Sequence, residues 1–150
     1  MHKNQYGHLL LMTVLSYFAM FALMYAMVDR FSNIYPNLNQ AYMAGLMAAP
    51  MVIIELVVMR AMYPNMKFNV TIIGVALLAL VLSFIGIRMQ TAVGEIQFVK
   101  SMIPHHSGAI LMCDQATIAD AELKKLCDGI AKGQQQEIDQ MKAILARLTK

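Results

Sequence analysis

Three long apolar stretches constrain the fold of this chain more than any other feature of its sequence. They lie at residues 9–28, 41–62 and 70–87. At a rise of about 1.5 Å per residue, helices of this length cross the roughly 30 Å hydrocarbon core of a bilayer. The first stretch is longer than the apolar core of a signal peptide, and no small-x-small cleavage site follows it. We therefore expect three membrane-spanning helices in residues 1–88.

Charged residues are distributed unevenly along the chain. Residues 1–87 hold six of them, whereas the other 63 residues hold fifteen. The second proportion is ordinary for a water-soluble segment, and the first is far below it. The sequence thus predicts a membrane region at 1–88 and a polar segment at 89–150. The high apolar content argues against disorder, and a net charge of +3 without a basic run argues against nucleic-acid binding.

Lysine and arginine near the span ends predict the orientation of the chain. Lys3, Arg60 and Lys67 fall on one side of the three spans. Arg30 and Arg88 fall on the other side. Because positive residues favour the cytoplasmic side, we expect a cytoplasmic N terminus and an extracytoplasmic C-terminal segment. The expected location is the inner (plasma) membrane of a bacterium, with the polar segment in the periplasm.

Several residues within the predicted spans have both a structural and a functional interpretation. Small residues recur at four-residue spacing, which suits close helix packing or contact between copies of the chain. Methionines could pass a soft cation such as Cu(I), although methionine also fills irregular gaps between helices. The spans carry Met20, Met24, Met27, Met43, Met47, Met51 and Met59. Glu55 is a candidate functional group, and a protonated interhelical hydrogen bond is an equally good explanation of it.

The polar segment has helical periodicity from Gln90 onward, and one face of that helix collects side chains that bind metals. At about 100° per residue, the face centred on Met102 also holds His105, His106, Met112 and Cys113. Imidazole and thioether ligands together favour Cu(I), followed by Cu(II) or Zn. Two complications remain: Pro104 could kink the helix, and one histidine could be a core residue bonded to a carboxylate.

A second helix is expected to begin after the N-cap Asp120 and to run to about residue 148. Its apolar stripe includes Gln134, Glu137 and Met141. A carboxylate among apolar residues needs a partner or a proton. Because the two helices face each other in a simple hairpin, the expected partners of Glu137 are His105, His106 or a metal that they share.

The two cysteines, Cys113 and Cys127, lie on these facing helices at similar distances from the turn. A disulfide between them is plausible outside the cytoplasm and would contribute about 3 kcal/mol in the chain-entropy model. The alternative is that both are thiolate ligands, with Cys113 near His106.

Two motifs identify a family that this segment resembles. The first is Phe98-Val-Lys-Ser-Met-Ile-Pro-His105-His106 with Met112, and the second is Gln134-Gln-Gln-Glu137-Ile-Asp-Gln-Met141. Over residues 90–148 they resemble the domain-of-unknown-function 305 family, one branch of which has three N-terminal spans. The resemblance implies a ferritin-like helical bundle and an association with copper binding and copper tolerance outside the cytoplasm. Its matched positions are His105, His106, Met112, Gln134, Glu137 and Met141.

The sequence departs from the resembled pattern at one position and lacks one motif of ferritin-like enzymes. Ala121 stands where the family often has proline, which affects only the entry into the second helix. No Glu-x-x-His pair occurs, so di-iron carboxylate chemistry is not expected. A glycine-rich phosphate loop and a recognisable set of nucleophile and base are also missing. We therefore do not expect an enzyme.

Three functions are compatible with these residues. The leading one is copper buffering, handover or tolerance by a membrane-anchored extracytoplasmic protein. Its ligands would come from His105, His106, Met102, Met112, Glu137 and Met141, with Gln134 supporting them. The second is an oligomeric scaffold in which His105, His106 and Glu137 form a buried polar network. The third is a small oligomeric metal transporter that uses Glu55 and the span methionines.

The predicted fold is an all-α membrane protein in which three transmembrane helices precede an extracytoplasmic helical hairpin. A segment of 63 residues with two helices buries little surface, and its second stripe is wider than one partner helix covers. We therefore expect a homo-oligomer whose hairpins pack as a ferritin-like bundle. The other expected partners are the lipid bilayer and copper-handling proteins.

Overall fold

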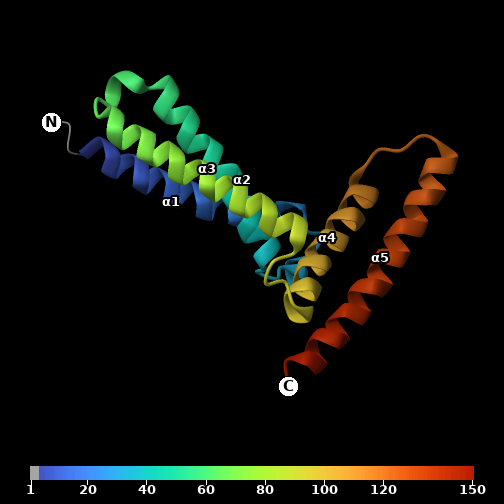
Figure 1. Ribbon diagram of the computed structural model, residues 1–150. Coiled ribbons are helices and arrows are strands. Elements are labelled where there is room, and N and C mark those ends of the chain that lie inside the picture. Colours follow the sequence, from blue (N-terminus) through green and yellow to red (C-terminus); the bar gives the residue numbers. More distant parts are fainter. Residues whose placement is uncertain (1–3) are drawn as a thin grey trace. The chain divides into compact units, whose positions relative to one another are not determined.

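The computed structural model describes residues 4–150, and these residues form helices and no strands (Figure 1). The five α-helices are α1 (Gln5–Leu23), α2 (Leu38–Val58), α3 (Met66–Met89), α4 (Glu95–Gln115) and α5 (Ala121–Leu148). Three short 3₁₀ turns are η2 (Met24–Met27), η3 (Phe31–Asn33) and η4 (Arg60–Met62). The all-helical prediction is confirmed.

Three segments are long and apolar enough to cross a membrane: Gln5–Met27, Leu38–Val58 and Met66–Met89. The predicted number of spans is therefore confirmed, and their predicted bounds need correction. Each helix begins three or four residues before the expected stretch, because polar residues continue the helix beyond the apolar part. The second helix ends at Val58 rather than at residue 62, where a separate 3₁₀ turn follows. Lys3, used above for orientation, lies outside the described residues.

Contacts divide the chain into two compact units. The first contains the chain through Met24 together with Asn39–Ala92. The second contains Val93–Lys150 and also Tyr25–Leu38, the connection between α1 and α2. The charge distribution predicted a division after residue 88 and therefore assigned residues 25–38 to the membrane region. By their contacts, these residues belong to the second unit. We call Tyr25–Leu38 the strap.

In the first unit, small residues allow α2 and α3 to approach closely. A Cβ added at Gly45 would lie 2.7 Å from Ser83 Oγ, and one at Gly86 would lie 2.9 Å from Tyr42 Cε1. Such distances are too short for a real Cβ, so both glycines are needed for this packing. Gly45 and Gly86 therefore serve packing within one chain.

In the second unit, α4 and α5 form an antiparallel hairpin around a small apolar core (Figure 1). The core residues are Val99, Ile103, Ile110, Ile138 and Leu145. Asp120 caps α5 as predicted, because its carboxylate accepts the Leu123 backbone N–H at 2.7 Å. The expected start of α4 at Gln90 is wrong, since Gln90 and Ala92 have φ of 50° and 58° and end the preceding helix. Pro104 lies within a helix that continues to Gln115.

The strap packs against α4 through a buried polar cluster. Ser107 Oγ donates to the Asp29 carboxylate and accepts the Asp29 backbone N–H at 2.8 Å. The same carboxylate accepts from Asn33 Nδ2 at 2.7 Å and lies 3.2 Å from Arg30 Nε. Ser107 is fully buried, and the Asp29 side chain is 8% exposed. Further along, Gln97 Oε1 accepts the backbone N–H of Leu38 at 3.0 Å.

Candidate functional site

The central pair of the candidate site joins the two helices of the hairpin. His106 Nε2 on α4 lies 2.7 Å from Glu137 Oε2 on α5, which is hydrogen-bonding distance. Of the two candidate histidine partners of Glu137, the structure thus selects His106. The expectation that Glu137 lies on the buried face is wrong. Its side chain is 56% exposed, against 11% for His106, because α4 covers only part of the α5 stripe.

The second ring nitrogen of His106 is buried and has no hydrogen-bond partner among the described residues. When Nε2–H donates to Glu137, the neutral ring leaves a lone pair on Nδ1. Metal-binding histidines commonly have this arrangement, with one nitrogen on the metal and the other held by a carboxylate. Glu137 therefore suits the role of orienting the ring, and Nδ1 is the atom available as a ligand.

Two methionines lie at the same level of the hairpin, one turn from this pair. Met102 is four residues before His106 on α4, and Met141 is four residues after Glu137 on α5. Because the helices are antiparallel, both steps lead in the same direction, by about 6 Å. Met102 is half-buried, and Met141 packs against the apolar core. The register thus places two thioethers on the side of His106 nearer the start of α4.

The other expected ligands are more exposed or lie further along the helices. His105 is exposed, with its ring centroid 6.0 Å from that of His106. Met112 is 54% exposed and lies six residues beyond His106, a rise of about 9 Å along the helix. Gln134 is one turn from Glu137 in the direction away from Met141. The structure does not bring Met112 or Gln134 to the level of Met102 and Met141.

The donor set limits which ions could bind. Among residues 4–150, no three His, Cys, Asp or Glu side chains group in a way that could hold a metal ion. An ion at His106 would therefore depend on thioether sulfur as well as imidazole nitrogen. Such a set favours soft ions, Cu(I) first.

The cysteines are not part of this donor set. Cys113 and Cys127 form a disulfide between α4 and α5, with their Cα atoms 5.3 Å apart. The bond lies near the turn of the hairpin, about two turns beyond His106. Of the two alternatives for these cysteines, the structure therefore contains the disulfide rather than thiolate ligands.

Glu55 lies near the end of α2 and has a local partner. Its Oε1 accepts a hydrogen bond from Tyr63 Oη at 3.2 Å. Burial, followed by the hydrogen bond to Glu55, raises the pKa of Tyr63 and keeps it a donor. Met43 and Met47 on the same helix, and Met59 just after its end, are 38–44% exposed, whereas Met51 is half-buried. The contact of Glu55 is with a residue of the α2–α3 connection, so it is not the interhelical hydrogen bond that the sequence suggested.

Sequence reasoning missed the strap cluster, which adjoins the site because Ser107 directly follows His106. Asp29 and Asn33 lie more than seventy residues before Ser107 in the chain. The residues around Asp29 and Asn33 have a composition typical of a connecting turn. The periodicity of a sequence does not reveal contacts between residues so far apart in the chain. The one available signal was Asp29 itself, the first acidic residue of an otherwise charge-poor region.

Comparisons with known proteins find a family match for the C-terminal part of the chain. Residues 88–150 match the family model described as Domain of unknown function (DUF305). An uncharacterized protein, L153 of Acanthamoeba polyphaga mimivirus, is 29% identical over 140 residues, which cover 91% of this chain and 90% of the viral protein. No solved structure gives a significant match. Residues 88–150 are therefore similar to the DUF305 domain, and they follow three helices that are long and apolar enough to span a membrane.

Proposed function

We propose that this protein is a membrane-anchored copper-binding protein that buffers copper or hands it over outside the cytoplasm. The observation that supports this most strongly is the His106 ring, held by Glu137 through Nε2 and left with an unpartnered Nδ1. The cargo would be Cu(I), because the register of the hairpin places the thioethers of Met102 and Met141 one turn from His106. The proposal concerns binding and transfer, not catalysis.

Each residue has a separate role in this proposal. Glu137 accepts the Nε2–H of His106, which fixes the ring and makes Nδ1 the free donor atom. Met102 and Met141 supply polarizable sulfur that remains uncharged at any pH. His105 is exposed on the preceding position and would meet an incoming ion first. Nδ1 is buried, so binding requires a small opening of the hairpin at this level.

The test is a titration of Cu(I) into the full chain in mild detergent, in competition with a chelator of known affinity. We expect His106→Ala to weaken binding by at least 100-fold. Glu137→Gln should weaken it 10- to 100-fold, which is the usual effect of removing a residue that orients a ligand. The full chain is needed because a fragment of residues 90–150 would lack the strap.

His8→Ala is the matched control, because His8 is an exposed histidine on α1. This variant should bind Cu(I) as the parent does. Met102→Leu and Met141→Leu keep the side-chain volume nearly constant and should each lower affinity through loss of sulfur. Equal affinities of the parent and His106→Ala would contradict the proposed site.

A scaffold function is the second candidate, and the direct His106–Glu137 contact is the observation that favours it. The contact links α4 to α5 without any ion, so it could serve only to fix the hairpin. In that case both Glu137→Gln and His106→Ala would destabilise the hairpin in metal-free protein, while Cu(I) affinity would not change.

We also propose that the hairpin associates with a second copy of itself. Its end near the disulfide exposes large apolar side chains that the chain's own residues do not cover. They are Met112, Leu123, Leu126 and Ile130, each 37–58% exposed. The hairpin of a second copy offers the same face in return, as a symmetric pair requires. A four-helix arrangement would then bury both faces.

Light scattering of the full chain in detergent tests this association. We expect a dimer or larger oligomer for the parent and a shift toward monomer for Leu126→Glu. Gln140→Glu adds the same charge at an exposed position on α5 outside this face and should leave the oligomer intact. A monomeric parent would rule out the association.

The proposal includes an orientation of the chain in the membrane. The N terminus would be cytoplasmic, and the DUF305 domain would lie outside the inner (plasma) membrane of a bacterium, in the periplasm. The Cys113–Cys127 disulfide supports a position outside the cytoplasm, because disulfides persist in oxidising compartments. Copper-handling proteins of that compartment are the proposed exchange partners.

A further inference from the structure

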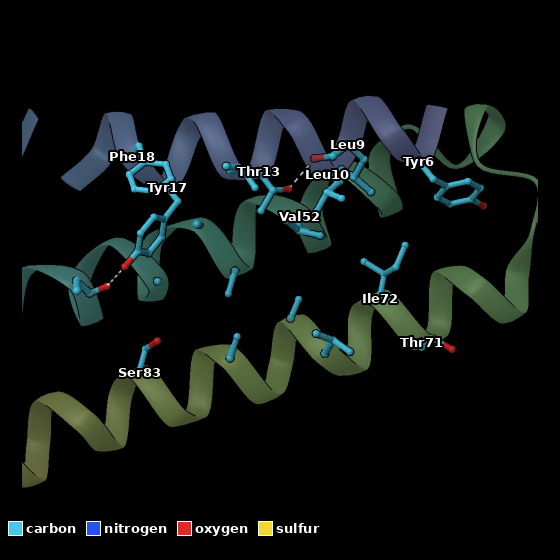
Figure 2. A pocket seen from close by; sticks show the side chains of 18 of the residues that line it. Tyr6, Leu9, Leu10, Thr13, Tyr17, Phe18, Val52, Thr71, Ile72 and Ser83 are labelled. Carbon is cyan, nitrogen blue, oxygen red and sulfur yellow. Dashed lines mark hydrogen bonds between the residues drawn. The ribbon is translucent and has the colours of Figure 1, made fainter. Parts of the chain in front are cut away.

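The three candidate spans surround an apolar groove of about 830 Å³. In Figure 2, α1 side chains such as Tyr17 lie along one wall, Ile72 and Ser83 of α3 lie along the other, and α2 lies between them. On α3 the lining extends from Phe68 to Ser83, about 22 Å of helix. The groove therefore runs along the helices for more than the thickness of one leaflet, about 15 Å.

The lining of the groove provides few hydrogen-bonding groups for a polar ligand. The hydroxyls of Thr13, Tyr17 and Thr71 each donate to a backbone carbonyl of the chain itself, at 2.8–3.2 Å. The other lining residues are almost all aliphatic, aromatic or small. A ligand that fits must therefore be mainly hydrocarbon along its length.

Two kinds of occupant suit a groove of this length, a helix and a lipid acyl chain. A helix with its side chains is about 10 Å wide. A helix of a second copy could cover the opening without filling it. A lipid acyl chain is narrower and already runs parallel to spans in a bilayer.

One end of the groove carries positive charge. This end is marked by Tyr6, whose ring lies 4.7 Å from that of Phe68 and 5.3 Å from that of Tyr63. Lys67, next to Phe68, and Arg60 in η4 are both exposed, and neither forms an ion pair within residues 4–150. The carboxylate of α2 at this end, Glu55, accepts a hydrogen bond from Tyr63, and the two cations outnumber it. An anionic headgroup is thus electrostatically favoured here.

We propose that this groove is a binding site for an anionic phospholipid. One acyl chain lies along the groove, and the phosphate lies near Lys67 and Arg60. The proposal is independent of copper binding, because every residue that it uses belongs to the first unit.

The test is electron spin resonance of the full chain in phosphatidylcholine vesicles that contain spin-labelled phosphatidylglycerol or spin-labelled phosphatidylcholine. We expect phosphatidylglycerol to be bound at least fivefold more strongly, since each nearby cation contributes about a fivefold preference. Ala79→Leu narrows the groove and should abolish the excess of restricted phosphatidylglycerol over restricted phosphatidylcholine. Lys67→Gln should lower the preference for phosphatidylglycerol about fivefold and leave phosphatidylcholine binding unchanged.

Two control variants separate the groove from the rest of the bundle surface. Ala19→Leu makes the same change at an exposed α1 position that does not line the groove, and it should have no effect. Arg88→Gln removes a cation at the opposite end of α3 and should keep the preference. Equal binding of the two lipids by the parent would overturn the proposal. So would a change of oligomeric state in Ala79→Leu with lipid binding retained, because the groove would then be a contact between copies.

Discussion

A Ser107→Ala variant is expected to release the strap from α4 and to speed hydrogen exchange of the strap amides by about 100-fold. Ser107 Oγ accepts the Asp29 backbone N–H and donates to the Asp29 carboxylate. A hydrogen bond to a charged group contributes about 1.5–3 kcal/mol, and the Asp29 backbone N–H left without its acceptor adds a further penalty. A loss of about 3 kcal/mol corresponds to the 100-fold change. Hydrogen exchange measured by mass spectrometry on peptides from residues 25–38 tests this predicted acceleration.

Ser32→Ala is the matched control, because Ser32 belongs to the same strap and is exposed. Its exchange should equal that of the parent. The α5 amides near the disulfide should also be unaffected, since Cys127 is cross-linked to Cys113 and lies outside the core against which Tyr35 of the strap packs. Unchanged strap exchange in Ser107→Ala would mean that the strap is held mainly by its other contacts, such as Leu38 with Gln97.

The contrast between the strap and the hairpin shows which parts of the fold the sequence could predict. The hairpin depends on local rules: helical periodicity, an N-cap at Asp120, and two cysteines equally distant from a turn. Each rule involves residues close together in the chain, so the elements followed from the pattern. The strap depends on Asp29, Asn33 and Ser107, and no periodicity links residues so far apart. Their spatial relation required the structure.

The candidate site was predictable to a similar extent. The periodicity placed both histidines and Glu137 on facing helices, and the structure was needed to select His106 as the partner of Glu137. The exposure of Glu137 could not be predicted. A stripe of apolar residues indicates which face of α5 is covered, but not how much of that face the partner helix covers. Met112 shares a helix face with His105 and lies two turns away along the axis. A face defined by angle alone does not include this axial separation.

Cys113→Ser with Cys127→Ser is expected to lower the stability of the hairpin by about 3 kcal/mol, because the bond closes a loop of 14 residues. The apolar core does not compensate for its loss near the turn. The core residue closest to the disulfide is Ile110, and Leu123 and Leu126 beyond it are about half exposed. Opening should therefore start at the turn. Limited proteolysis within residues 116–120 measures it, with cleavage about 100-fold faster in the double variant when cleavage tracks the opened population.

Reductant provides the control on the same bond. Treatment of the parent with a reductant should produce the same acceleration as the two substitutions. The double variant should not respond to reductant at all, since it has no disulfide to reduce. Proteolysis of the parent that stays slow after both thiols become alkylatable would show that packing between α4 and α5, rather than the cross-link, holds this end closed. The substitutions also leave the His106–Glu137 pair in place, so Cu(I) affinity should fall by less than tenfold.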